Sequence, residues 1–470
     1  MDKFLLDAAR VVPSARQRRW FDVGFYAFVH FGMNTFTDRE WGDGTEDESL
    51  FNPTRLDCDQ WVAAIQSAGM KGLILTAKHH DGFCLWPSKY TEHSVKNSLF
   101  EGDVVKLAAE ACARAGIPFG FYLSPWDRNS PLYGTPAYND YFCNQLTELL
   151  TGYGEIFCVW FDNACGEGPT GKRQVYDFPR YISLIRKYQP NAVIFNDYGP
   201  DVRWCGNEAG APRQAEWAVV PTELCPYAAV QTGPGPLADQ GDLSALYNTD
   251  AFIGTQPEIF YSRGLAFCPC EFDMSIRPGW FFHESEEPHS LDRLFRTYVT
   301  SVGANAGLNL NVPPNREGRI DERDVRRLRE LGQALRRAFG DPLPLRVRRV
   351  DAGDRWQGEW ELTFPEGTPP VRTLELSEDL SCGQRVESFK IVCEESGGTH
   401  FPLYQGSTVG NRRLCRLENP FALQNPLTDD SAGSMRKLRL LVTASRGVPA
   451  LSAIRAYGDD GEGLRHGLSR

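Results

Sequence analysis

The sequence predicts an α/β protein: a (β/α)8-like barrel of the TIM type, followed by a C-terminal antiparallel β-sandwich. Three observations support this prediction. Apolar strand-like segments alternate with helical segments from about residue 26 to about residue 190, which is the pattern of parallel strands joined by helical crossovers. Polar and aromatic residues gather after the strands, as they do on the catalytic rim of a barrel. After about residue 343 the strands become short and alternating, which is typical of a sandwich.

The barrel segments follow one another in regular order. The spacing of Trp61, Ala64 and Ile65 gives the first helix one apolar face, and Asp57 or Asp59 can cap its start. An open doubly wound sheet is the competing fold, but no Gly-x-Gly-x-x-Gly turn follows the first strand. Strands are expected at 26–32, 71–83, 118–129, 156–161 and from 191, with helices at 56–70, 103–117, 138–152 and 178–190.

The later part of the barrel is less regular in sequence. Loops dominate residues 211–270, and segments 269–283 and 303–318 can supply the last strands. Residues 321–340 predict a helix with an acidic start, basic later turns and a terminating glycine. The Pro-rich segment that follows indicates a boundary. We therefore expect a catalytic barrel at residues 1–342 and a sandwich domain at residues 343–470.

Composition and charge narrow the function classes. The formal net charge of -11 and the pI of about 5.4 disfavour nucleic acid and anionic membranes as partners. The 13 cysteines have no metal-binding spacing, and several lie in apolar strands, which indicates a reducing compartment. Neither a signal peptide nor an apolar run of about 18 residues is visible. We expect a cytoplasmic protein, although a signal peptide removed beforehand would leave the same sequence.

The apolar run from Ile156 to Phe161 ends on a carboxylate, Asp162, and small residues follow. Such a run suits a strand that is buried on both faces of a parallel sheet. Asp162 then lies where the strand leaves the core, at the edge where barrel enzymes carry out catalysis. The alternative is that Asp162 only caps the turn that follows the strand.

A second carboxylate, Glu208, lies in the loop after the next expected strand. If Asp162 and Glu208 follow neighbouring strands, their carboxyl groups can approach to roughly 5–5.5 Å, the separation at which one attacks a sugar and the other transfers protons. That chemistry requires an ionised Asp162 and a Glu208 that holds a proton at neutral pH. The chain has 61 acidic residues, so a chance pair is common and this pair alone is weak evidence.

Three histidines, His30, His79 and His80, follow the first two strands. A metal site is one interpretation. However, adjacent residues of a strand point to opposite faces, so His79 and His80 would not readily share one ion. We therefore expect no metal and no cofactor. Hydrogen bonding to a polyhydroxylated ligand is favoured over purely structural roles, because imidazole both donates and accepts.

Four tryptophans, Trp41, Trp126, Trp204 and Trp280, fall in expected loops at the same rim of the barrel. A single tryptophan in a loop usually packs against the core. Four at one rim indicate a surface on which a sugar ring can stack.

Seven motifs resemble those of the α-L-fucosidases of glycoside hydrolase family 29, and they occur in the family's order. They are HFGMNTFTDREWG, KHHDGFCLW, YLSPWDRN, VWFDNACGEG, RWCGNEAG, MSIRPGWFFH and LNVPPNREG. In the C-terminal part, SEDLSCGQRVESF is similar to the family's sandwich domain. The resemblance extends from about residue 20 to about residue 460.

The resemblance implies a retaining exo-α-L-fucosidase that releases terminal fucose from oligosaccharides or glycoconjugates. Asp162 matches the family's nucleophile. Glu208 matches the acid/base of the branch that prefers α-1,3 and α-1,4 linkages in Lewis-type glycans, and Glu271 is its rival. Trp280 matches a residue beside the methyl group of fucose. The residues expected to bind the substrate are His30, Glu40, Trp41, His79, His80, Tyr122, Trp126, Glu271 and Trp280.

Two alternative functions stay open at this point. A fucose-binding protein without catalysis would keep the histidines and tryptophans but should lack one carboxylate. A metal-dependent barrel hydrolase would be inactivated by a chelator. The expected partner is a fucosylated oligosaccharide, with neither nucleic acid nor membrane, and the sequence does not give the oligomeric state.

Overall fold

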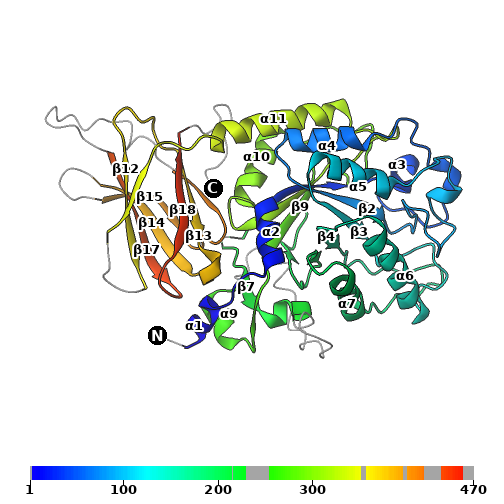
Figure 1. Cartoon of the computed structure of the whole chain (residues 1–470), viewed down its shortest axis with the longest axis horizontal. Coiled ribbons are helices and arrows are strands. Elements are labelled where there is room, and N and C mark those ends of the chain that lie inside the picture. The colour runs from blue at the N-terminus through cyan, green and yellow to red at the C-terminus, as the bar shows by residue number, and fades with distance from the viewer. Residues whose placement is uncertain are drawn as a thin grey trace.

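The computed structural model describes residues 3–213, 215–228, 253–350, 356–394, 400–417 and 436–458. A barrel with surrounding helices forms one part of the molecule, and a block of antiparallel strands lies beside it (Figure 1). The predicted fold class is therefore confirmed. Helix α11 (Glu322–Phe339) is the last long helix of the described residues, and β11 (Arg346–Arg349) begins the antiparallel part. The domain boundary at residue 342 stays a prediction.

Eight parallel strands form a nearly closed barrel. Along the sheet their order is β5-β4-β3-β2-β1-β10-β9-β6, and one parallel bridge between Phe195 and Val202 connects the two ends of that order. Strand β6 falls in a segment that the sequence indicates as a loop. The strands are β1 Phe25–Val29, β2 Leu73–Lys78, β3 Phe119–Leu123, β4 Cys158–Trp160, β5 Val193–Phe195, β6 Arg203–Trp204, β9 Cys270–Ser275 and β10 Ala306–Asn311.

Helices pack around the outside of the barrel and close its core. The Asp57 side chain caps α4 by accepting a hydrogen bond from the backbone N–H of Gln60, and Asp103 caps α5 in the same way. The cap of α4 is thus Asp57 and not Asp59. The helices around the barrel are α2 Ala15–Val23, α4 Cys58–Ser67, α5 Val104–Ala115, α6 Ala137–Gly152, α7 Phe178–Tyr188, α10 Leu291–Thr300 and α11.

The loop-rich region between β6 and β9 carries a small antiparallel pair. Strand β7 (Val219–Pro221) pairs with β8 (Leu265–Phe267), and helix α9 (Gln256–Tyr261) lies between them in sequence. Two further short α-helices of the described residues are α1 (Lys3–Ala9) and α3 (Met33–Thr37). No helix among the described residues is both long enough and apolar enough to cross a membrane.

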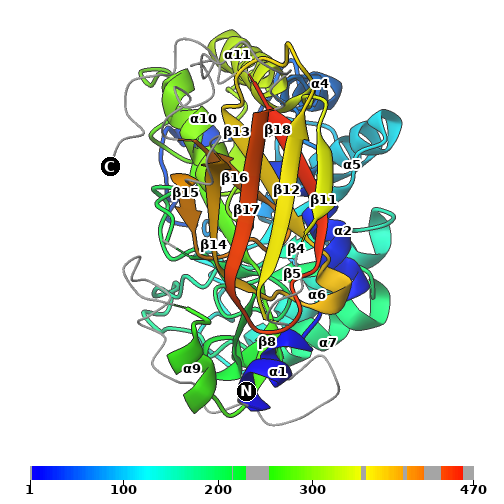
Figure 2. The ribbon, with the colours of Figure 1, turned by 90° about the vertical axis from the view of Figure 1, so that its left-hand side faces the viewer.

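The C-terminal part consists of two antiparallel sheets that face each other (Figure 2). Their inner faces share one apolar core, to which Leu362 contributes from the larger sheet and Leu374 from the smaller one. The larger sheet has the order β11-β12-β17-β14-β15 and the smaller one β16-β13-β18. The strands are β12 Gly358–Phe364, β13 Thr373–Glu378, β14 Val386–Glu394, β15 His400–Gly406, β16 Arg413–Arg416, β17 Arg436–Ser445 and β18 Leu451–Tyr457.

Direct contacts join the barrel to the sandwich. The guanidinium of Arg446 lies 3.5 Å from the ring centre of Trp217, which is a close cation–π contact. Nearby, the backbone N–H of Asn411 donates to Asn305 Oδ1 over 2.7 Å. Both Arg446 and Trp217 are buried, so the two parts share a packed interface.

Candidate active site

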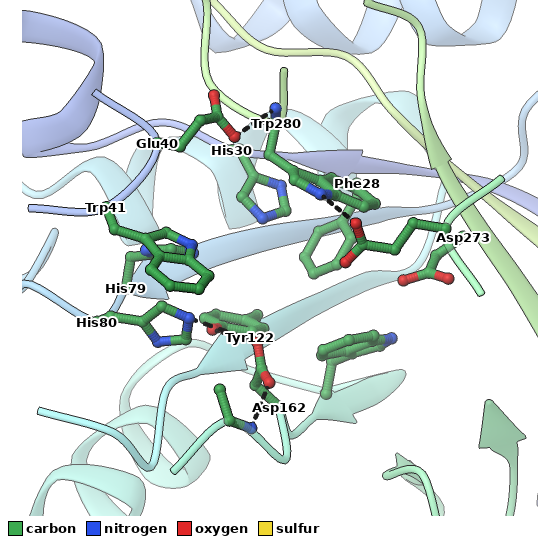
Figure 3. A pocket seen from close by; sticks show the side chains of 13 residues that line it. Phe28, His30, Glu40, Trp41, His79, His80, Tyr122, Asp162, Asp273 and Trp280 are labelled. Atoms are coloured by element: carbon green, nitrogen blue, oxygen red, sulfur yellow. Dashed lines mark hydrogen bonds and ion pairs between the residues drawn. The ribbon is translucent and has the colours of Figure 1, made fainter. Parts of the chain in front are cut away.

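A cavity of about 160 Å³ opens at the carboxyl ends of the barrel strands (Figure 3). The structure brings both predicted catalytic carboxyls to this cavity, together with most of the predicted binding residues. The predicted residues that line it are Asp162, Glu208, His30, Glu40, Trp41, His79, His80, Tyr122 and Trp280. The cavity is also lined by four residues that are not among those predicted from the sequence: Phe28, Trp160, Ala164 and Asp273.

Asp162 lies just beyond the end of β4 and is held by groups on both of its oxygens. The backbone N–H of Ala164 donates to Oδ1 over 2.7 Å, and the hydroxyl of Tyr122 donates to Oδ2 over 3.1 Å. His80 Nε2 is 3.7 Å from the same Oδ2. The hydrogen bonds from Ala164 and Tyr122 fix the direction of the carboxylate, which is what a nucleophile needs.

Glu208 lies in the loop that follows β6. Trp280 Nε1 donates a hydrogen bond to Glu208 Oε2 over 3.3 Å. Burial raises the pKa of Glu208, the negative charges of Asp162 and Glu40 raise it further, and the Trp280 hydrogen bond acts in the opposite direction. The net effect is a raised pKa, which favours a protonated Glu208 and suits a general acid.

The two carboxyls do not follow neighbouring strands, and this corrects the expectation from the sequence. Asp162 follows β4 and Glu208 follows β6, while β5 lies between them in the barrel. The inward-facing residues of a barrel are layered so that alternate strands contribute to the same layer. Strands two apart can therefore still present their residues to one cavity.

Glu40 reaches the cavity from the long loop after β1. The backbone N–H groups of Trp280 and Phe281 donate to its two oxygens over 2.8 and 3.1 Å. His283 Nε2 lies 2.8 Å from Glu40 Oε1, and its Nδ1 lies 2.8 Å from Asp38 Oδ1. Burial lowers the pKa of His283, but its hydrogen bonds to the two carboxyls outweigh that effect and the pKa is raised. His283 is not among the residues that the sequence predicts for the site, although it supports Glu40.

The three predicted histidines all face the cavity. His79 and His80 come after the last residue of β2, so they do not alternate as residues within a strand do, and their ring centres are 4.1 Å apart. The expectation that they point to opposite faces is wrong. Burial lowers the pKa of His30 to about 3 and that of His79 well below its usual value. No group of three or more His, Cys, Asp or Glu side chains in the described part of the chain could hold a metal ion.

The neutral histidines are oriented by hydrogen bonds behind them. His30 Nδ1 lies 2.9 Å from Asn311 Oδ1, and the amide nitrogen of Asn311 donates to Ser275 Oγ. His80 Nδ1 lies 2.8 Å from Ser124 Oγ, whose hydroxyl donates to the carbonyl of Trp126. In both cases the partner accepts, so Nδ1 carries the hydrogen and Nε2 is left as an acceptor for a ligand hydroxyl.

Aromatic rings form the apolar walls of the cavity. The rings of Phe28 and Trp160 are 5.1 Å apart, and the ring of Trp160 stacks on Phe195 at 4.1 Å. Trp280 packs against His30 with ring centres 5.0 Å apart. Trp41 is 60% exposed at the mouth, so it can cover a bound molecule.

Two of the predicted tryptophans lie behind the cavity wall. Trp126 packs 4.8 Å from His80 and 5.7 Å from Trp41, and so supports residues that line the cavity. Trp204 ends β6, and its Nε1 donates to Asp273 Oδ1 over 2.5 Å. Only Trp41 and Trp280 of the expected stacking surface line the cavity.

The structure does not bring Glu271 to the cavity. Its side chain is fully buried inside the barrel, where Trp160 Nε1 donates to it over 2.8 Å and Asn309 Nδ2 over 3.2 Å. The hydroxyl of Tyr26 donates to its other oxygen. Burial raises the pKa of Glu271 to about 7. Both oxygens of Glu271 accept hydrogen bonds from neighbouring side chains beneath the cavity. Glu271 therefore supports Trp160 at the floor of the site and does not contact a bound substrate.

Comparisons with known proteins identify the family of the chain. A family model for α-L-fucosidases matches residues 12–338. The chain is 39% identical to α-L-fucosidase 1 of Arabidopsis thaliana, over 95% of this chain and 88% of the relative.

Two solved structures are also similar. A glycoside hydrolase 29 family member from an unknown rumen bacterium has a TM-score of 0.80 and 37% identity, over 95% of this chain and 77% of that one. A Ruminococcus gnavus glycoside hydrolase 29 fucosidase in complex with fucose has a TM-score of 0.78 and 28% identity, over 96% of this chain and 95% of that one. The match to the family model over residues 12–338, and the 39% identity to a relative that is covered over 88% of its length, show that the chain belongs to the α-L-fucosidases of glycoside hydrolase family 29, hydrolases of the EC 3.2.1.51 type.

Proposed function

We propose that the protein is a retaining exo-α-L-fucosidase in which Asp162 is the nucleophile and Glu208 the acid/base. One observation carries this proposal: both carboxyls line the same small cavity, in two different environments. Asp162 is held by the donors of Ala164 and Tyr122, while burial and nearby negative charge raise the pKa of Glu208. A pair of carboxyls with different environments is the arrangement that double displacement requires.

The reaction proceeds in two displacements. Asp162 attacks the anomeric carbon of fucose as the glycosidic C–O bond breaks, and the proton of Glu208 passes to the leaving oxygen. Glu208, now ionised, removes a proton from water, and that water attacks the anomeric carbon and releases Asp162. Two inversions return the original configuration.

The lining of the cavity suits one terminal fucose residue. A volume of about 160 Å³ is small for a chain of sugars, which supports exo action. His30, His79, His80 and Glu40 offer donors and acceptors for hydroxyl groups. Fucose carries a methyl group in place of a hydroxymethyl group, and the apolar ring of Trp280 offers a wall for it.

We infer further that the enzyme prefers α-1,3 and α-1,4 linkages in branched glycans of the Lewis type. The support is the Gly-Asn-Glu motif that ends in Glu208, which resembles the acid/base motif of that branch of the family. A panel of defined oligosaccharides with α-1,2, α-1,3, α-1,4 and α-1,6 fucose tests the inference. Faster release from the α-1,3 and α-1,4 members is expected, and a preference for α-1,2 or α-1,6 would overturn it.

Azide rescue tests the two catalytic roles. In Glu208→Ala, azide should restore the rate on an activated aryl fucoside and give an α-fucosyl azide, because azide then attacks the fucosyl-enzyme. In Asp162→Gly, azide should replace the nucleophile and give a β-fucosyl azide. Glu284→Ala, at an exposed carboxyl outside the cavity, is the control and should behave as wild type. If the α-fucosyl azide arises in Glu271→Ala and not in Glu208→Ala, the acid/base is Glu271.

A further inference from the structure

A third carboxyl, Asp273, lines the same cavity as Asp162 and Glu208, and the mechanism above does not use it. It belongs to β9, where Phe272 and Met274 point into the apolar layer under the helices and Asp273 points into the barrel. Its side chain is nearly buried, with 4% exposed. Figure 3 shows it across the cavity from the histidines. A carboxyl in this position needs a functional or structural reason, since burying it is costly.

Asp273 is tied to the loop that carries Glu208. Its Oδ1 accepts a hydrogen bond from Trp204 Nε1 over 2.5 Å. Trp204 is the last residue of β6, and Glu208 follows four residues later. Strands β6 and β9 also pair directly, with Arg203 opposite Cys270. The hydrogen bond therefore fixes the base of the Glu208 loop to the barrel wall.

The surroundings of Asp273 favour its neutral form. Burial raises the pKa of Asp273 well above its usual value, against the effect of the Trp204 hydrogen bond. Three neighbouring acidic side chains, Glu208 after β6, Glu271 on β9 and Asp197 after β5, raise the pKa of Asp273 further. A neutral carboxyl keeps one O–H donor and adds no charge beside Glu208.

We propose that Asp273 is a positioning residue for the acid/base Glu208: as an uncharged acid it holds Trp204, and through Trp204 the loop that presents Glu208 to the leaving oxygen. This inference rests on the proposed role of Glu208. Asp273 itself does not contact the breaking glycosidic bond. Two consequences can be tested. One concerns the charge of residue 273, and the other concerns substrates whose leaving group must be protonated.

The first consequence is that Asp273→Asn should leave the pKa of Glu208 unchanged. The amide oxygen of Asp273→Asn can accept from Trp204, its N–H replaces the acid O–H, and its charge is zero. The pH profile of kcat/KM should therefore keep its alkaline limb at the wild-type position. If Asp273 is ionised at working pH, Asp273→Asn removes a negative neighbour, the pKa of Glu208 falls and the limb moves to lower pH. That movement would overturn the proposal.

The second consequence concerns Asp273→Ala, which removes the acceptor of Trp204. Acid catalysis then weakens, so substrates with poor leaving groups should lose about 100-fold in kcat/KM, while an aryl fucoside with a good leaving group loses only a few-fold. Asp273→Asn should restore both rates. Equal losses on both substrates would indicate general loosening of the site and overturn the proposal. Thermal unfolding of both variants shows whether the fold is retained.

Azide rescue distinguishes a failure of the positioning role of Asp273 from a failure of the proposed catalytic roles. Under the proposal, azide does not rescue Asp273→Ala, whereas it rescues Glu208→Ala. Rescue of Asp273→Ala with an α-fucosyl azide would make Asp273 itself the acid/base and overturn both assignments. Rescue of Glu208→Ala together with equal losses in Asp273→Ala would overturn only the positioning role.

Discussion

The hydroxyl of Tyr122 donates a hydrogen bond to Asp162 Oδ2 over 3.1 Å, from the neighbouring strand of the barrel. The same oxygen is 3.7 Å from His80 Nε2, while the other oxygen is held by a backbone N–H. Tyr122 is fully buried, and burial raises the pKa of its hydroxyl well above the usual value, so it stays a donor at all working pH values. One wall of the cavity is thus arranged to direct a carboxylate toward the substrate.

Tyr122→Phe should lower kcat/KM by roughly 10- to 100-fold, because a hydrogen bond to a charged group contributes about 1.5–3 kcal/mol. The matched control is Tyr153→Phe. It removes a similar hydrogen bond, 2.8 Å long, from Tyr153 to Asp103 Oδ2 on the outside of the barrel. Steady-state kinetics on an aryl fucoside measure both. Equal losses in the two variants would contradict a specific role for Tyr122.

The hydrogen bond from Trp280 to Glu208 should affect the pH at which kcat/KM falls on the alkaline side of the profile. Glu208 must be protonated to act as an acid, so kcat/KM falls as pH rises through its pKa. The hydrogen bond from Trp280 Nε1 lowers that pKa, so Trp280→Phe should raise it and move the alkaline limb to higher pH.

The control for Trp280→Phe is Trp86→Phe, which removes a 2.9 Å hydrogen bond from Trp86 Nε1 to Glu148 away from the cavity. Its profile should match that of the wild type. The maximal kcat/KM of Trp280→Phe should fall as well, because the ring lines the sugar cavity. The pH of the alkaline limb is measured independently of that maximal value. A limb that stays in place or moves to lower pH would count against Glu208 as the acid.

The sequence predicts the frame of the barrel well where elements are long or end in a clear signal. Helix α4 begins at the aspartate cap that its sequence suggests, and the apolar run before Asp162 forms β4. Strand β6 is not predictable in this way, because it has two residues and its pairing with β9 is a tertiary contact. Because the unpredicted β6 precedes Glu208, Asp162 and Glu208 follow strands that are separated by β5 and not neighbouring strands.

The site is predictable from the sequence where polar residues follow strands, and the family motifs supply the rest. The sequence does not predict how deep an inward-facing side chain lies inside the barrel. Glu271 and Asp273 face the same side of β9, yet the first lies under Trp160 and the second lines the cavity. Two residues along a strand correspond to about 6.6 Å, enough to separate a floor from a wall. The sequence does not predict Trp160 as a cavity residue for a related reason. An inward-facing aromatic ring within an apolar strand has the same sequence pattern as a core residue.

Glu271 should make stability depend on pH. Its pKa is raised to about 7 in the folded protein, against about 4.3 in an unfolded chain. The folded state therefore keeps a proton that the unfolded state loses, so the free energy of unfolding decreases as pH rises through this window. The loss from this one group is roughly 3 kcal/mol.

Glu271→Gln removes that titration and should reduce the difference between the urea midpoints at pH 5 and pH 8. The exposed carboxyl of Glu101 provides the control, because Glu101→Gln should leave the difference unchanged. An unchanged difference in Glu271→Gln would show that the buried carboxyl keeps its charge at both pH values. Glu271→Ala should also lose activity through Trp160, without rescue by azide.

The contact between α11 and the end of α4 should depend on Gly332. A Cβ atom at this position would lie 1.9 Å from the carbonyl oxygen of Ser67 and 2.9 Å from Cα of Ala68, both in backbone that cannot rotate away. Alanine normally stabilises a helix relative to glycine by roughly 0.5–1 kcal/mol. At Gly332 the overpacking outweighs this gain, so Gly332→Ala should destabilise by about 1–3 kcal/mol.

Gly152 is the matched control, because it ends α6 and a Cβ there would meet nothing within 4 Å. Gly152→Ala should leave the urea midpoint unchanged or raise it, while Gly332→Ala lowers it. Since Gly332 lies outside the catalytic cavity, kcat of the folded variant at 25 °C should stay close to that of the wild type. A stabilised Gly332→Ala would mean that α11 can shift away from α4 at little cost, and that the close approach of the two helices does not determine the stability of the barrel.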